Sequence, residues 1–489
     1  MSRRPLEVVY TVGPRSLERV AAHSAGRLPQ PARHRQDVER DRRFGAGALF
    51  VLIVALAFGG ATHGDALSSA VVRLVSLPLL GVAIWRLAQA HQSLRAHLAM
   101  WLLFGAFLVP LLQLIPLPPQ IWSGLPGREF LITDYRSAGI PPPWLPVSLT
   151  PYETADALLG LIPPAAMFLA ALTLDARWRR RMVLAIPLFA LLAVGLGMMQ
   201  VAGGELSPLR FYAQTNPDSG VGFFANRNHQ AALLVTAVAL TPQWMTAFRD
   251  QADGRGRFGL FLAFAIELVL IVGIGVTRSR AGVLLAAPAI IGGVLVAVGQ
   301  GGDKSFRRSA LALLGAAVVG SALVGVFASS RLIDRFQSPL SADQRLQASP
   351  AIEHAARVFA PVGSGLGSFD RIYRIYEPIG AVRDLYLNHA HNDWLELWLE
   401  TGAAGLFVVG AFVLWWLWAT VRLWRPGRHA RGDGARAGAS LVIGLLLAHS
   451  IVDYPLRTAA LVSLLALTCG ILAAPGDPSP TSAAVQDWG

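Results

Sequence analysis

Apolar runs of about the length needed to cross a bilayer recur along most of the chain. A membrane-spanning helix needs roughly 20 consecutive apolar residues. Hydrophobic residues make up 54% of the 489 residues and charged residues only 15%, more apolar surface than a water-soluble fold of this size can bury. The sequence therefore predicts an all-α membrane protein with about twelve transmembrane helices. We place these spans at 46–62, 67–85, 98–115, 154–174, 182–201, 228–248, 258–276, 281–299, 308–328, 403–421, 438–452 and 456–474.

The charges between the runs predict how the chain crosses the membrane. Cytoplasmic connectors of membrane proteins are rich in Lys and Arg. If residues 1–45 are cytoplasmic, the inside connectors 175–181 and 422–436 carry four and five basic residues, whereas the outside connector 203–225 holds only Arg210. The net charge of +12 is thus topology information and does not indicate a nucleic-acid partner.

The segments outside the spans differ in character. Residues 1–45, with ten arginines and five acids, are expected to form a disordered basic cytoplasmic arm, and residues 476–489 a cytoplasmic tail. Between them lies the polytopic membrane domain, residues 46–475. It contains two long outside loops, 116–152 and 329–402. The first is rich in Pro and Trp, so we expect a stiff loop with little regular structure.

Loop 329–402, between spans nine and ten, carries the signals of a folded, partly helical segment. Ser349 and Pro350 are typical of a helix start, and an apolar stripe follows it as far as Phe359. A glycine-rich turn comes next, at 363–369. A second helix is expected to start near Asn388 and to run into span ten.

The start of this second helix offers a candidate general base. His391 falls there, and the positive end of a helix disfavours the charged imidazolium, so a neutral imidazole is expected. Taken alone, His391 is more simply interpreted as a surface histidine. Asn392, Glu396 and Glu400 recur every four residues on one helix face, and His389 is expected to be a spectator.

Arginines gather near the outer boundary, against the positive-inside trend. Residues 277–282 (TRSRAG) form a very short turn that places Arg278 and Arg280 there. A guanidinium at this depth is costly unless an anion compensates it, and its fork matches phosphate oxygens. Snorkelling to lipid phosphates is the alternative. Arg210, Arg227 and Arg345 are further outside candidates.

Several other chemistries have no support in the sequence. The glycine turn lacks the strand–turn–helix context of a nucleotide loop, and there is no Walker sequence, zinc-type cluster or EF-hand loop. The single cysteine, Cys469, lies in an apolar run. We therefore expect no metal and no cofactor.

Four motifs in order resemble the O-antigen ligase/polymerase superfamily. His391-Asn392 followed by Gly402-Ala-Ala-Gly405 is similar to its signature. The stretches GFFANRNHQA at 222–231, TRSRAG at 277–282 and PVGSGLGSF at 361–369 are similar to its other motifs. The segment from His449 to Tyr454 resembles a late-span pattern of the exopolysaccharide branch.

This resemblance implies transfer of a saccharide from an undecaprenyl-diphosphate-linked donor to an acceptor hydroxyl, at the periplasmic face of the bacterial inner membrane. It implies that His391 deprotonates the acceptor and Arg280 holds the donor diphosphate. For a second family arginine, both Arg210 and Arg227 lie nearby. Substrate-binding candidates are Arg345, Arg210, Arg227, Asn228, Asn392 and Glu400. Expected partners are the lipid-linked glycan, an acceptor glycan or glycolipid, membrane lipids and other polysaccharide-assembly proteins, with no nucleic acid.

The alternatives divide by class. Polymerase, ligase and protein-glycosylating ligase are variants that the sequence does not separate, and it does not give the sugar, the linkage or the oligomeric state. A non-enzymatic lipid-linked glycan flippase is the competing class. A flippase of this kind predicts internal repeats, and the sequence shows no obvious one. It also predicts ionisable groups near the middle of spans, and Glu267 is the clearest acid at such a position.

Overall fold

The computed structural model describes residues 31–62, 66–249, 255–300, 304–327, 344–382, 387–425 and 433–476. The chain separates into two compact units, residues 1–46 and residues 47–489. Everything below concerns the second unit, except the first part of one helix.

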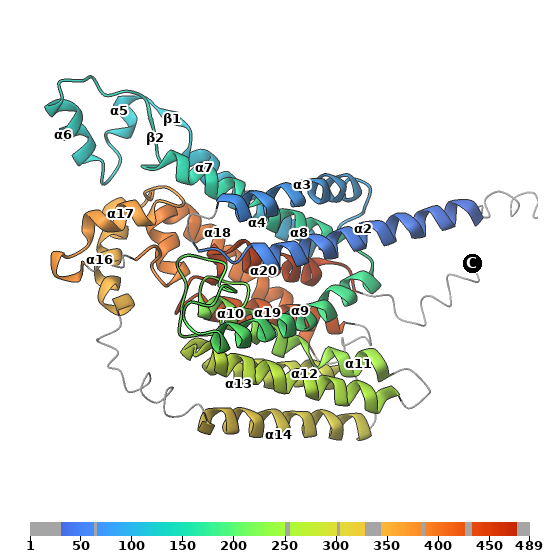
Figure 1. Cartoon of the computed structure of the whole chain (residues 1–489). Helices are drawn as coiled ribbons and strands as arrows, with labels where there is room; N and C mark the ends of the chain where they lie inside the picture. Colours follow the sequence, from blue (N-terminus) through green and yellow to red (C-terminus); the bar gives the residue numbers. More distant parts are fainter. Residues whose placement is uncertain are drawn as a thin grey trace, which may run out of the picture. The chain divides into compact units, whose positions relative to one another are not determined.

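Helices make up nearly all regular structure in the described residues (Figure 1). The one sheet in this described part of the chain pairs β1 and β2, two residues each, in antiparallel register. The elements are α2 (Pro31–Phe58), α3 (Ala66–Leu87), α4 (Leu94–Gln113), β1 (Pro116–Leu117), α5 (Pro119–Trp122), α6 (Glu129–Ser137), β2 (Leu145–Pro146), α7 (Pro151–Leu159), α8 (Ile162–Thr173), α9 (Ala176–Ala202), α10 (Arg227–Leu240), α11 (Gln243–Arg249), α12 (Arg255–Thr277), α13 (Arg280–Gly299), α14 (Lys304–Phe327), α16 (Gln344–Phe359), α17 (Phe369–Tyr376), η2 (Ile379–Ala381), α18 (Asp393–Trp424), α19 (Gly434–His449), η3 (Pro455–Arg457) and α20 (Ala459–Ala473).

The helices agree with a multi-pass membrane protein. Each of the twelve predicted runs coincides with a helix over most of its length. Within the described residues, seven helices are both long and apolar enough to cross a membrane, and α19 and α20 are shorter apolar helices. The all-α prediction is therefore confirmed, whereas the number of twelve spans stays a prediction.

Helix α2 begins earlier than the sequence suggests. It starts at Pro31, inside the segment expected to be a disordered arm, so residues 31–45 are helical. Arg43 donates to Glu39 four residues earlier, a spacing that supports a helix. Residues 1–30 and the tail from residue 477 lie outside the described residues.

Helix α10 is the central helix of the second unit. Every residue from Asn228 to Leu240 is buried, because α9, α12, α13 and α19 all pack against it. A helix that is apolar all round needs such a surrounding. Helices α12, α13 and α14 contact one another beside it (Figure 1). This packing fixes the start of α10, where Arg227 and Asn228 lie.

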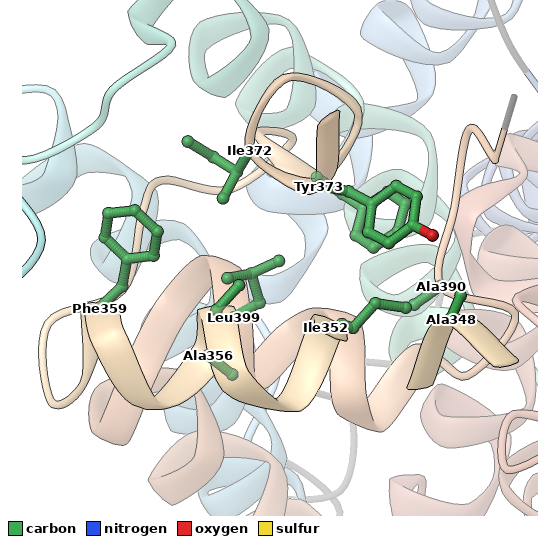
Figure 2. Close-up of a cluster of buried hydrophobic side chains, with 10 residues drawn as sticks. Ala348, Ile352, Ala356, Phe359, Ile372, Tyr373, Ala390 and Leu399 are labelled. Atoms are coloured by element: carbon green, nitrogen blue, oxygen red, sulfur yellow. The ribbon is translucent and has the colours of Figure 1, made fainter. Parts of the chain in front are cut away.

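Loop 329–402 is folded over its described part, as predicted. Ile352 and Phe359 of α16, Ile372 of α17 and Leu399 of α18 are all buried in one apolar cluster (Figure 2). Ala390, the residue before His391, belongs to the same cluster. Burial of such side chains stabilises the loop by about 1.5–3 kcal/mol for each large one. The cluster thus gives the His391 segment a fixed base.

Two details of the loops correct the predictions. Helix α16 starts at Gln344, so Ser349 and Pro350 lie inside it, and the Ser349 hydroxyl donates to the Arg345 carbonyl one turn earlier. Loop 116–152 contains more regular structure than expected, namely α5, α6 and the small sheet. Pro and Trp form part of that structure, since the buried Trp122 ring donates to the carbonyl of Pro143 at 2.9 Å.

Candidate active site

The segment before α18 presents His391 in an unusual backbone conformation. Helix α18 begins at Asp393, later than the predicted start near Asn388, and Asn392 is its N-cap. The Asn392 side chain accepts from the backbone N–H groups of Trp394 and Leu395 at 3.0 and 3.1 Å. His391 therefore precedes the cap, with φ at 51°, a left-handed value that is uncommon outside glycine. Asn392 is placed to cap the helix.

The His391 imidazole is paired with a buried carboxylate. Its Nδ1 lies 3.0 Å from Oδ1 of Asp453, whose side chain is fully buried. Asp453 lies in the short connector between α19 and α20. A carboxylate on one ring nitrogen fixes the tautomer and the orientation of an imidazole. The arrangement leaves Nε2 as the nitrogen that can exchange a proton with a bound molecule.

Two of the predicted binding residues also meet at Asp453. Arg345 of α16 approaches Oδ2 with its Nη1 at 3.5 Å, and the Asn228 side-chain amide donates to the same oxygen. The carboxylate thus joins three elements that are far apart in sequence. Burial alone would raise the pKa of Asp453, but the Arg345 charge and the contact with the His391 imidazole outweigh it and hold that pKa well below its usual range. Asp453 is therefore an anion at neutral pH.

The same surroundings keep His391 neutral. Burial lowers the pKa of His391 most strongly, the Asp453 carboxylate raises it, and Arg345 and His389 lower it. The net shift is downward from the ordinary value. A neutral imidazole near pH 7 is the form that can accept a proton.

The predicted short turn between α12 and α13 is confirmed, and it connects to Asp453. Ser279 is the N-cap of α13, and its hydroxyl donates to the Asn228 side-chain oxygen at 2.7 Å. Arg280 is the next residue. Ser279, Asn228 and Asp453 therefore form a continuous chain of side-chain contacts from the Arg280 turn to His391.

Helices α10 and α13 both begin at this place, each with an arginine as its first residue. Asn226 caps α10 and Ser279 caps α13. The N-terminus of a helix carries a partial positive charge and favours anions. Arg227 and Arg280 add full charges to these two ends. The region is therefore suited to a negatively charged group.

The remaining outer arginines take different positions. Arg227 and Arg278 both approach the Asp218 carboxylate, at 3.6 and 3.3 Å. Arg210 donates to the carbonyls of its own loop, including Asn216 at 3.1 Å and Ser219 at 3.0 Å. Arg210 thus stabilises a turn, whereas Arg227 stands next to Asn228 in the Asp453 network.

A second histidine–carboxylate pair lies two residues before the first. His389 Nδ1 is 2.7 Å from Oε1 of Glu396, and its Nε2 is 3.2 Å from the carbonyl of Thr62. Arg457 contacts Glu396, and its Nη1 donates to Glu400 at 2.7 Å. The predicted binding residue Glu400 is therefore buried in an ion pair.

The pKa of His389 shifts in the opposite direction from that of His391. Burial lowers the pKa of His389, but the Glu396 carboxylate outweighs it, and the net shift is upward. Tyr454 separates the two imidazoles, with ring centroids 4.4 Å from His389 and 4.7 Å from His391.

The glycine motifs pack against each other below this site. Gly402 interrupts α18 with φ at 58°, and a side chain there would overlap the carbonyl oxygen of Pro361. The glycine turn forms hydrogen bonds with backbone carbonyls next to this break. The Ser364 N–H donates to the Leu399 carbonyl, and the Gly365 N–H donates to the Glu400 carbonyl. Only glycine suits such a close backbone approach. The contact between these two motifs thus supports the first turns of α18, which follow His391.

A cavity of about 920 Å³ lies beside the second pair. His389, Glu396 and Arg457 form part of its polar side, and α4, α8, α18 and α20 supply apolar walls that include Val109 and Phe412. Its size is in the range of small-molecule sites. Among the described residues, no group of three or more His, Cys, Asp or Glu side chains is arranged to hold a metal ion.

The fold and the buried histidine–carboxylate site thus define a multi-pass membrane protein with a candidate acid–base centre at a helix start. Residues 265–410 match the family model described as O-antigen ligase. This match covers the segment from α12 to the first part of α18, with Arg280, Arg345 and His391, and supports the resemblance to the O-antigen ligase/polymerase superfamily. The resemblance is confirmed, and the family indicates a glycosyltransferase-like enzyme that works on lipid-linked glycans. No curated protein matches the chain.

Sequence reasoning missed Asp453 and Arg457 as parts of the site. The resemblance of the segment from His449 to Tyr454 to a family pattern is the one sequence signal for Asp453, and it does not indicate what Asp453 does. Asp453 is 62 residues from its partner His391, so no helical or strand periodicity connects them.

Proposed function

We propose that this protein transfers a saccharide from an undecaprenyl-diphosphate-linked donor to an acceptor hydroxyl, at the periplasmic face of the inner membrane. The observation that carries the proposal is the convergence of His391, Arg345 and Asn228 on the buried Asp453 carboxylate. Such a carboxylate–imidazole pair, next to two arginine-bearing helix starts, suits an attack by a hydroxyl on a diphosphate-linked carbon.

His391 acts as the general base. Its Nε2 takes the proton of the acceptor hydroxyl while Asp453 holds Nδ1 and stabilises the imidazolium that forms. The acceptor oxygen then forms the new bond to the anomeric carbon of the donor, and the bond from that carbon to the diphosphate oxygen breaks. A positioned base of this kind contributes about 10²–10⁴-fold.

Arg280 holds the donor diphosphate and balances the charge that develops on it as it leaves. Two features support this role: the partial positive charge of the α10 and α13 starts, and the nearness of the Arg280 turn to the Asp453 network. Fixed positive groups aimed at a leaving anion are a large part of catalysis. Arg227 is the second donor-binding arginine in this proposal, because Arg210 is committed to its own turn.

The deciding experiment is transfer in vitro by the purified protein with a defined lipid-linked donor and a matching acceptor. We expect product with the wild type and almost none with Arg280→Ala, which loses charge stabilisation of the leaving group. Arg177→Ala is the matched control, because Arg177 is highly exposed at the start of α9, away from the site. An Arg280→Ala variant as active as Arg177→Ala would refute the role of Arg280, and translocation of the donor without transfer would favour the flippase.

A deletion strain separates the variants of this activity. Unpolymerised single repeats would identify a polymerase. Normal chains left on the lipid carrier would identify a ligase.

A further inference from the structure

The backbone at His391 needs to be held in place. A residue other than glycine in the left-handed region costs on the order of 1–3 kcal/mol and persists only where its surroundings impose it. With φ at 51°, His391 is such a residue. The contacts on both sides of it therefore determine where its imidazole points.

On the downstream side, the segment is tied to the helix and to the α19–α20 connector. Asn392 caps α18, and the Asp393 N–H donates to the carbonyl of Ser450 at 2.9 Å. These contacts fix residues 392 and 393. They leave the residues before His391 to be held by something else.

On the upstream side, the Thr62 carbonyl contacts the side chains of Asn388 and His389, and one carboxylate makes two further polar contacts nearer to His391. Glu396 accepts from the Ala390 N–H with Oε2 at 2.7 Å, and its Oε1 lies 2.7 Å from Nδ1 of His389. Each oxygen thus serves one residue of the segment. Hydrogen bonds to a buried charged group are stronger than neutral ones.

The charge of Glu396 is itself balanced. Its side chain is fully buried, and Arg457 lies 3.5 Å from Oε1 while also contacting Glu400 and Asp393. A buried carboxylate without a counter-charge would be strongly destabilising. Arg457 and His389 together keep Glu396 ionised, so that both of its oxygens can accept.

Holding His389 also sets the environment of the active imidazole. The His389 ring lies 4.4 Å from the Tyr454 ring, and Tyr454 meets His391 edge-on at 4.7 Å with an interplanar angle of 73°. A shift of His389 would move the tyrosine that packs against His391.

We propose that Glu396 is the positioning residue for His391. Its carboxylate fixes residues 389 and 390, and the backbone then directs the His391 imidazole toward Asp453. The role of Glu396 rests on the proposed function in so far as His391 is the base. The geometric part, that Glu396 keeps His391 in its buried position, stands independently.

The test replaces Glu396 by Gln, which keeps the size but removes the negative charge and one of the two acceptor oxygens. Labelling of His391 by diethyl pyrocarbonate, quantified by peptide mass spectrometry, reports its accessibility without any need for activity. We expect the labelling rate to rise about tenfold, the factor for losing one charged hydrogen bond. Glu267→Gln is the matched control, since Glu267 is also a buried glutamate but lies in α12. It should label like the wild type.

Kinetics give the second readout. We expect kcat of Glu396→Gln to fall about tenfold with KM unchanged, as for a group that acts only on the geometry of the base. The groups around His391 are Asp453, Arg345, His389 and Tyr454. Partial exposure relieves the burial that lowers the pKa of His391, so the acid limb of the pH–rate profile should move to higher pH.

A second variant guards against misfolding. Glu396→Asp keeps the negative charge beside Arg457 but is one methylene shorter, and it should raise His391 labelling in the same direction. Unchanged His391 labelling in a folded Glu396→Gln or Glu396→Asp protein would overturn the proposal. An inactive wild type with increased labelling in the variants would refute the transfer activity alone.

Discussion

The two histidine–carboxylate pairs on either side of Tyr454 differ in what their second ring nitrogen meets. His389 is bound at both nitrogens, by Glu396 and by the Thr62 carbonyl, whereas the Asp453 contact of His391 uses Nδ1 alone. The pKa of His389 is raised and that of His391 is lowered. One imidazole is thus held by two acceptors, and the other keeps one ring nitrogen for the proposed proton transfer. His389 and His391 are only two positions apart, and the difference between them comes from the groups that each imidazole contacts.

The largest expected effect comes from removing each imidazole in turn. His391→Ala should reduce transfer by about 10³-fold, because the base is lost. His389→Asn should reduce it by only about tenfold, since an amide can replace one of its two hydrogen bonds. Initial rates with the lipid-linked donor measure both. Equal losses in two equally folded variants would abolish the distinction between the pairs.

Replacing the carboxylate of the active pair should have the next largest effect. Asp453→Asn removes the partner that orients His391, and we expect a loss of about 10²-fold in kcat/KM. Because the Asp453 charge raises the pKa of His391, its removal lowers that pKa further. The acid limb of the pH–rate profile should therefore move to lower pH.

Arg345→Gln provides the opposite shift as a control. The Arg345 charge lowers the pKa of His391, so its loss should move the acid limb to higher pH. Shifts of the same sign in Asp453→Asn and Arg345→Gln would contradict the proposed electrostatic origin.

The support of the second pair can be tested through the break in α18. Gly402→Ala places a side chain against Pro361 at a left-handed φ and should destabilise the protein by about 1–3 kcal/mol. Gly410→Ala is matched to it, because Gly410 lies in the same helix with open space around it. That variant should be neutral or slightly more stable. Thermal unfolding in detergent compares the two, and equal unfolding temperatures would mean that the break does not hold α18.

Much of the fold could be predicted because its signals are local. The bilayer-length runs, the turn before Arg280 and the apolar stripe of α16 each depend on neighbouring residues, and the structure confirms them. The start of α18 was misplaced by a few residues because Asn388 and Asn392 are equally good caps by type. The hydrogen bond from the Ser450 hydroxyl to the Asp393 carboxylate favours Asn392 as the cap, and this contact joins segments that are far apart in the sequence.

The site was only partly predictable for the same reason. His391 stands in a recognisable motif, but the value of Asp453 depends on packing between the last helices and α10. Glu396 and Glu400 were expected to share a face, and both do contact Arg457. A periodic sequence pattern does not indicate that this helix face is buried against the Arg457 guanidinium.

Asp453 follows its three partners in the sequence, and this order has a consequence for biosynthesis. Asn228, Arg345 and His391 leave the ribosome long before their common carboxylate does. The proposed centre can assemble only once α19 and α20, the helices on either side of Asp453, have been inserted. Nascent chains that stall before this stage would hold the arginine-bearing turns without the carboxylate that pairs with His391.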